Sequence, residues 1–137
     1  MAPPRLSVND NYFKIIDTSQ KAYWLGFIAA DGCLLDTRPV LSIGLQIQDK
    51  SLLEQLRDDL GYEGMVHTYN HCVQLRLTSK EIKTDLMRLG ITPRKSLTLT
   101  WPQIEKSFYP DFIRGYFDGD GSWSIRQRGN YTGVIFN

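Results

Sequence analysis

Two short stretches of this sequence place an aspartate and two glycines in the same arrangement. They read YWLGFIAADGCL and DFIRGYFDGDGSW, and in each a glycine is followed five residues later by an aspartate and then by another glycine. The residues are Gly26, Asp31 and Gly32 in the first stretch, and Gly115, Asp120 and Gly121 in the second. Hard divalent cations prefer carboxylate ligands, so the repetition raises the question of a shared metal site.

Small residues recur along one face of each stretch if both are helical. Gly26 and Ala30 are four residues apart, as are Gly115 and Gly119, which puts each pair on one helix face. A glycine inside a helix costs about 1 kcal/mol relative to alanine, so something must offset that cost. We expect the two helices to pack closely through these residues.

Such packing would bring Asp31 and Asp120 together at two helix C-termini. The helix dipole is negative there, and two carboxylates meeting at that point need a cation. Mg²⁺ suits hard oxygen ligands, and paired metals stabilise both oxygens of a phosphodiester undergoing cleavage. A calcium loop does not fit DGDGSW, because Trp123 stands where a glycine is required. The alternative is that Asp-Gly pairs simply end helices and start hairpins.

Hydrophobic periodicity predicts the elements that would hold these residues. A buried helix is expected over 22–30, opened by Thr18 or Ser19 and closed by Gly32. A second helix should begin at Asp49 or Ser51 and end near Leu60, and a third should cover 80–89.

Two strand pairs are expected between these helices. GCLLD should pair with VLSIGLQIQ, in which Leu41, Ile43, Leu45 and Ile47 would face the core. GMVHTY should pair with CVQLRLT through a turn at residues 70–71. The pattern then restarts with a helix from residue 110, followed by SWSIRQR and YTGVIF. The fold class is therefore α+β with an antiparallel sheet, and the organisation is a first repeat over 1–109 and the start of a second over 110–137.

Composition excludes several classes of protein. With 137 residues, 42% hydrophobic and 23% charged, the chain suits one globular domain and has no apolar run long enough to span a bilayer. The N-terminus lacks a signal-peptide core, which favours the cytoplasm. Cys33 and Cys72 form no CxxC motif, so we expect no zinc site. A net charge of +1 means that any nucleic-acid function needs charges segregated onto one face.

The two motifs resemble the LAGLIDADG signature of homing endonucleases, and the order helix, strand pair, helix, strand pair, helix resembles one αββαββα repeat of that fold. Ala29 stands where the signature has aspartate in the first motif, and Asp118 occupies that position in the second. The resemblance implies that Asp31 and Asp120 bind the catalytic divalent metal, Mg²⁺. It further implies that Asp49, Lys50 and Lys95 organise water and stabilise the phosphate.

The same resemblance implies that the polar faces of the strands bind double-stranded DNA. These positions carry side chains that hydrogen-bond base edges or phosphates, and none is acidic. They are Ser42, Gln46, Gln48, Gln74, Arg76, Thr78, Ser124, Arg126 and Arg128.

The expected function is therefore site-specific, metal-dependent cleavage of both DNA strands. One alternative is a nucleic-acid-binding protein of the same fold that does not cleave, either an RNA maturase or a transcription regulator. Another is a structural domain without a nucleic-acid partner. Because the second repeat is incomplete, we expect the chain to be a piece of a longer protein, a degenerate gene or part of a split enzyme. Alone it would bind weakly and cut poorly, and an exposed partial sheet favours association with a second chain.

Overall fold

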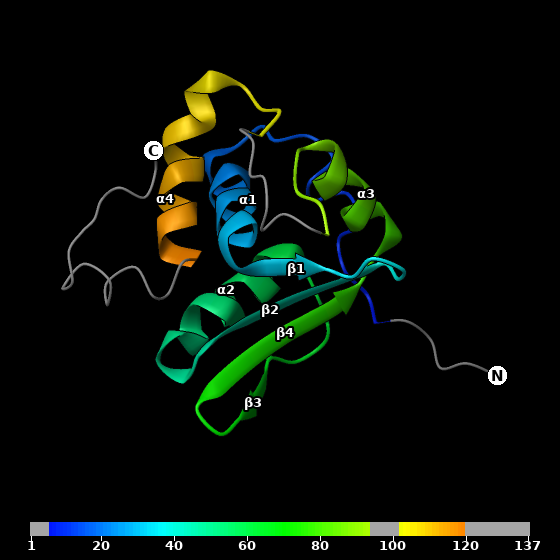
Figure 1. Ribbon diagram of the computed structural model, residues 1–137, viewed down its shortest axis with the longest axis vertical. Helices are drawn as coiled ribbons and strands as arrows, with labels where there is room; N and C mark the ends of the chain where they lie inside the picture. Colours follow the sequence, from blue (N-terminus) through cyan, green and yellow to red (C-terminus); the bar gives the residue numbers. More distant parts are fainter. Residues whose placement is uncertain (1–5, 94–101, 120–137) are drawn as a thin grey trace.

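The computed structural model describes residues 6–93 and 102–119 and shows an α+β fold (Figure 1). Its elements, in chain order, are α1 (Ser19–Asp31), β1 (Gly32–Leu34), β2 (Val40–Gln46), α2 (Lys50–Leu60), β3 (His67–Tyr69), β4 (Cys72–Thr78), α3 (Lys80–Arg88) and α4 (Tyr109–Gly119). Short 3-10 helices, Ile47–Asp49 and Lys106–Phe108, precede α2 and α4. The predicted order of helices and strands is confirmed through α4, and the strands expected after it lie outside the described residues.

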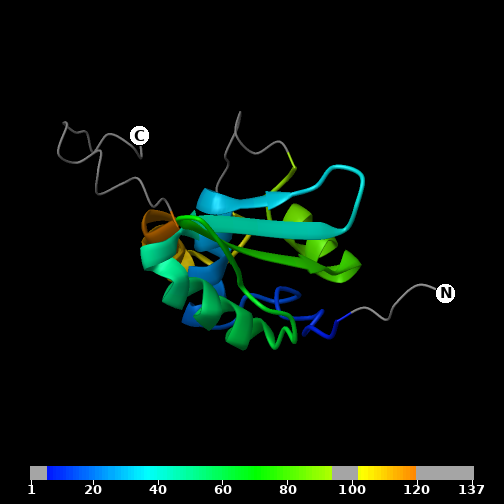
Figure 2. The ribbon, with the colours of Figure 1, turned by 90° about the horizontal axis from the view of Figure 1, so that it is seen from below.

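The four strands form one antiparallel sheet in the order β1-β2-β4-β3. The register pairs Ser42 with Cys33 on one side and with Arg76 on the other, and it pairs Gly44 with Gln74. Directly opposed residues share a face of the sheet, so these side chains lie together. Figure 2 shows α1 and α2 on the same side of the sheet, and no helix of the described residues covers its other face.

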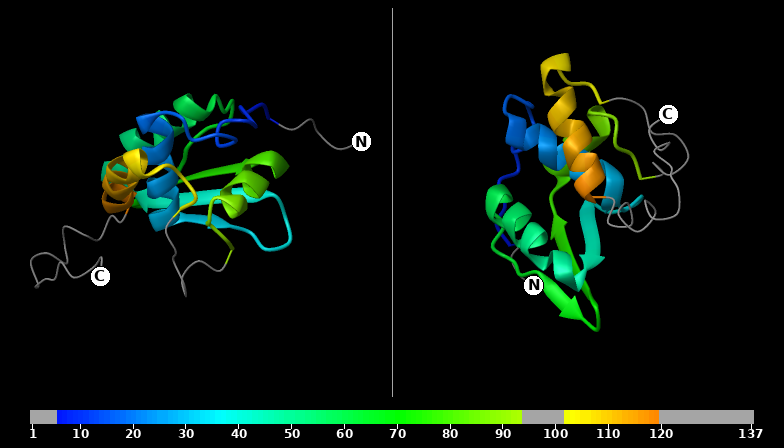
Figure 3. Two further views of the ribbon diagram at one scale, coloured as in Figure 1. Left: turned by 90° about the horizontal axis from the view of Figure 1, so that it is seen from above. Right: turned by 90° about the vertical axis from the view of Figure 1, so that its left-hand side faces the viewer.

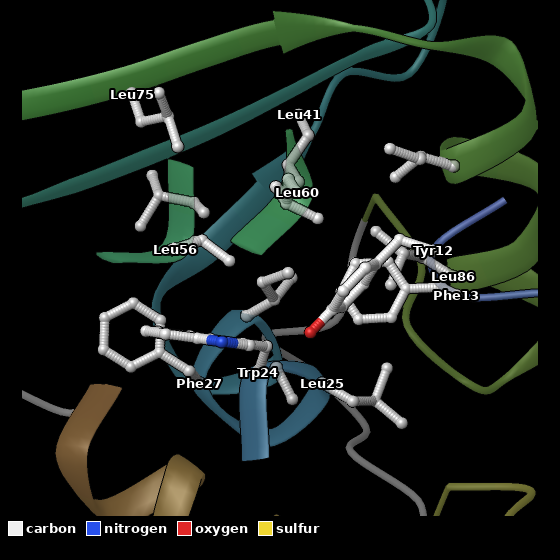
Figure 4. Packing of buried hydrophobic residues seen from close by; sticks show 14 of the residues in the cluster. Tyr12, Phe13, Trp24, Leu25, Phe27, Leu41, Leu56, Leu60, Leu75 and Leu86 are labelled. Atoms are coloured by element: carbon white, nitrogen blue, oxygen red, sulfur yellow. The ribbon is translucent and has the colours of Figure 1, made fainter. Parts of the chain in front are cut away.

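The core lies between the sheet and α1, whose residues are buried on almost every side. Trp24 meets Phe27 edge to face at 5.2 Å between ring centroids, and Leu75 extends from β4 toward them (Figure 4). Trp24 Nε1 donates a 2.7 Å hydrogen bond to Asp59 Oδ2 on α2, which satisfies the one polar atom of this buried ring. Fully burying a large apolar side chain contributes about 1.5–3 kcal/mol, so α1 is the element around which the core forms.

Local chemistry sets the helix ends. The Thr18 hydroxyl accepts a hydrogen bond from the Lys21 amide at 3.1 Å, so the predicted N-cap of α1 is confirmed. Gly61 ends α2 with a φ of 65°, a left-handed conformation that favours glycine. Gly32, by contrast, is extended, and a Cβ added there would lie 2.7 Å from Ile28 Cγ2. Crowding, and not backbone conformation, explains this glycine.

The strand predicted over 40–48 ends two residues early. The last residue of β2 is Gln46, opposite Cys72, the first residue of β4. Beyond Gln46 the Ile47 amide still donates a 2.8 Å hydrogen bond to the His71 carbonyl oxygen in the β3–β4 turn. The chain there already forms the 3-10 helix that leads into α2. The prediction that Ile47 faces the core was therefore wrong, and this side chain is 40% exposed.

An N-terminal segment that the periodicity did not predict completes the core. Val8, Tyr12, Phe13 and Ile16 are buried in it. The buried Ser79 hydroxyl donates a 2.6 Å hydrogen bond to Asp10 Oδ1, so this segment is also tied to the start of α3.

Helices α1 and α4 lie side by side, with backbone against backbone (Figure 3). A Cβ added to Gly26 would lie 2.0 Å from the Phe112 carbonyl oxygen, and one added to Gly115 would lie 1.9 Å from the Tyr23 carbonyl oxygen. Each glycine therefore faces the residue three positions before the other, which makes the contact reciprocal. Only glycine permits this approach, and it offsets the low helix propensity of both residues.

Gly115→Ala should destabilise the protein even though alanine favours helices. The added methyl group must push the two helices apart, and overpacking of this kind costs about 3 kcal/mol. Urea denaturation followed by circular dichroism measures the change. Gly44→Ala is the matched control, because its Cβ would meet no described atom closer than the Val73 carbonyl oxygen at 3.8 Å. Equal midpoints for Gly115→Ala and wild type would contradict the packing argument.

Candidate nucleic-acid interface and helix-end carboxylates

The face of the sheet opposite the helices is polar and carries no carboxylate on the residues that the structure describes. Alternation along β2 and β4, and the register of β1 and β3 against them, assign its members. They are Cys33, Val40, Ser42, Gly44, Gln46, His67, Tyr69, Cys72, Gln74, Arg76 and Thr78, of which Val40 is apolar and buried. A partner that presents phosphates or base edges would meet hydrogen-bonding groups here without a repelling charge.

Three strands are joined on this face by side-chain hydrogen bonds. The Tyr69 hydroxyl on β3 donates to Gln74 Oε1 on β4. Gln74 Nε2 in turn donates to Ser42 Oγ on β2 at 3.0 Å. The Gln74 amide is therefore held from both sides.

Among the predicted strand-face residues that the structure describes, all but one lie where the sequence places them. The exception is Gln48, which belongs to the 3-10 helix after β2 and donates a 2.7 Å hydrogen bond to Gln46 Oε1. Its placement on the strand was wrong because β2 ends at Gln46. Those on the face are Ser42, Gln46, Gln74, Arg76 and Thr78. Ser124, Arg126 and Arg128 lie outside the described residues.

Four polar or thiol side chains of this face were not predicted. His67 and Tyr69 lie on the edge strand β3. All three residues of this strand are exposed, so no alternation of polar and apolar residues indicates which side chains share a face. Pairing outward from the turn at Asn70 would have found them, since His67 opposes Gln74 and Tyr69 opposes Cys72. Cys33 and Cys72 present exposed thiols on the same face.

The C-terminal ends of α1 and α4 lie close together. A Cβ added to Gly119, the last residue of α4, would lie 2.6 Å from the Phe27 carbonyl oxygen and 3.2 Å from Ala30 Cβ. Asp31 is the last residue of α1 and is half-buried. Asp120 itself lies outside the described part of the chain, and the residues described contain no cluster of three or more His, Cys, Asp or Glu side chains. The carboxylate of Asp31 has the donor chemistry that suits Mg²⁺.

The other expected catalytic residues are only partly placed. Asp49 precedes α2 as its N-cap without a side-chain capping bond. Lys50 begins the helix, and its Nζ lies 3.9 Å from Glu54 Oε2 one turn further on. Both partners of this pair are well exposed, so it contributes little stability. Lys95 falls in the range 94–101, outside the described residues.

A polar bridge joins α1 to the last turn of α4. The Tyr23 hydroxyl donates a 2.6 Å hydrogen bond to Asp118 Oδ2, and the Arg114 guanidinium lies 5.0 Å from the centre of the Tyr23 ring. Burial raises the pKa of Tyr23, and the hydrogen bond and negative charge of Asp118 raise it further. The bridge holds the end of α4 that leads into Asp120.

A scan against protein-family models finds no match to this chain, and a search of curated proteins finds no similar sequence. Among the described helices, none has the length and apolar composition needed to cross a membrane.

Asp118→Ala should lower the pKa of the Tyr23 phenol toward its ordinary value of 10.0, because the acceptor and its charge are removed while burial remains. In wild type the folded protein holds the phenol proton of Tyr23 more tightly than the unfolded chain does. The resulting stabilisation is complete below pH 10, the pKa of the unfolded chain, and it is lost as the pH rises through the higher pKa of the folded protein. Ultraviolet titration of the tyrosines measures the shift. Tyr23→Phe is the control, because it removes the part of the titration curve that belongs to Tyr23. An unchanged titration in Asp118→Ala would contradict the hydrogen bond between Tyr23 and Asp118.

Proposed function

We propose that this chain is part of a metal-dependent, site-specific endonuclease that cuts both strands of duplex DNA and has the fold of the LAGLIDADG homing endonucleases. The observation that carries the proposal is the reciprocal glycine contact between α1 and α4. It occurs at the two positions that the repeated motif marks, and each helix leads directly into a motif aspartate. Two carboxylates brought together at helix ends are suited to binding a divalent cation.

The polar sheet face supports duplex DNA as the substrate. Apart from Gly44 and the buried Val40, its described residues carry amides, hydroxyls, thiols, an imidazole and the Arg76 guanidinium. The carboxylates of α2, including Asp58 and Asp59, belong to the helical side of the sheet. A chain with a net charge of +1 can therefore present a DNA-compatible surface, because the carboxylates of α2 lie on the other side of the sheet.

Asp31 and Asp120 would hold Mg²⁺ beside the scissile phosphates. When bound there, the metal supplies Lewis-acid stabilisation of the attacking and leaving oxygens. Water would lose a proton to solvent and attack phosphorus, the phosphodiester P–O bond would break, and the leaving oxygen would take up a proton from solvent. Lys50 and Lys95 would stabilise the phosphate charge, and Asp49 would orient the water.

Cleavage of a plasmid library that carries randomised sites tests this function. With Mg²⁺, the wild-type chain should cut a subset of sites slowly, because alone it is expected to cut poorly, and chelation should abolish this cutting. Asp31→Asn and Asp120→Asn should each lower the rate more than about 100-fold, because transition-state charge stabilisation is lost. Binding of the selected duplex should change little, since neither aspartate belongs to the sheet face. Asp36→Asn, in the loop after β1, is a matched control that should cut normally.

The outcomes separate the alternatives. Unchanged cleavage by both aspartate variants would remove the metal-site assignment. Duplex binding without cleavage by the wild-type chain would favour a maturase or a transcription regulator. An absence of any duplex binding would overturn the assignment of the sheet face.

A further inference from the structure

Gly44 lies in the middle of β2, where the fold gives no reason for a glycine. Its φ is not positive, since Gly61 and Gly90 are the described glycines with positive φ. An added Cβ would meet no described atom closer than the Val73 carbonyl oxygen at 3.8 Å, which is an ordinary contact. Glycine weakens a strand, and inside one it often marks a place where a partner approaches the backbone closely.

The missing side chain leaves a notch in the polar face. Gly44 is exposed and stands between Ser42 and Gln46 along β2, with Gln74 directly opposite on β4. The notch therefore opens beside the one amide of this face that is held from both sides.

The hydrogen bonds of Gln74 determine which of its atoms remain available. A primary amide has two lone pairs on oxygen and two hydrogens on nitrogen. Tyr69 occupies one lone pair of the oxygen, and Ser42 accepts one hydrogen of the nitrogen. These two residues lie on β3 and β2, on opposite sides of β4. Within the described residues, one lone pair and one hydrogen remain. Partners on opposite sides of Gln74 leave the amide edge between them for this lone pair and this hydrogen.

This edge presents an acceptor and a donor side by side. In the major groove, adenine offers the complementary pair, its N6 amino group and N7, and glutamine binds it through two hydrogen bonds. Guanine offers two acceptors instead, so it would leave the glutamine oxygen facing another acceptor.

We propose that Gly44 and Gln74 form a specificity site that reads one adenine in the major groove of duplex DNA. This assignment rests on the DNA-binding function proposed above. Gly44 admits the base edge, Gln74 reads it, and Tyr69 and Ser42 act as positioning residues that fix the amide. A side chain at position 44 would keep the base edge from reaching Gln74.

Selection from a random-sequence duplex library tests the proposal with the full chain, in EDTA so that no DNA is cut. Wild type should select a site that contains an adenine whose replacement by guanine weakens binding about 5- to 150-fold, the range expected for one bidentate contact. In Gln74→Ala this preference should disappear at that position alone. Tyr69→Phe should reduce the preference with little loss of affinity, because the amide is present but no longer fixed.

Gly44→Val provides a readout that a purely structural role would not give. Valine favours strands and fits the open space, so the thermal midpoint should equal or exceed that of wild type. Binding of the selected duplex should nevertheless fall at least tenfold. Arg76→Gln is the matched control on the same face, and it should weaken all duplexes alike and reduce the salt dependence of binding.

Each outcome bears on one proposal or both. Retention of every base preference by Gln74→Ala, or normal binding by Gly44→Val, would overturn the specificity site and leave DNA binding standing. An absence of duplex binding by wild type would overturn both.

Discussion

The contact between the backbones of α1 and α4 is the constraint on which the rest of the arrangement depends. Gly26 and Gly115 each lie against a carbonyl oxygen of the other helix, so neither helix can slide or rotate without a clash. One side of α1 is buried against the sheet, and this contact fixes α4 on another side. The position of the last turn of α4 relative to Asp31 follows directly from it.

The reciprocity of this contact gives the helix pair a local two-fold character, and one polar bridge breaks it. Tyr23 and Asp118 are hydrogen-bonded, whereas the matching positions in the two motifs are Phe112 and Ala29, which have no hydroxyl and no carboxylate. The bridge therefore occurs once in the pair. It anchors the end of α4, where helices otherwise tend to fray.

The sheet separates two chemical environments that the overall charge conceals. The helical side carries the apolar core and the carboxylates of α2, where Asp59 accepts hydrogen bonds from Trp24 and Gln20. The opposite side, in the part of the chain that the structure describes, carries mainly uncharged polar groups together with Arg76. Because a strand alternates its side chains between the two faces, the same short segments build both environments.

The sequence by itself determined the helices, the N-cap of α1 and the pairing of the strands, because these depend on local periodicity and on neighbours a few residues apart. It also indicated the close approach at Gly26 and Gly115, since glycine inside a helix demands a reason. Tertiary structure alone decided that β2 ends at Gln46, that residues 6–16 join the core, and that Tyr69 and Ser42 hold Gln74. Those features depend on which residue of a distant strand stands opposite, and no local pattern records that register.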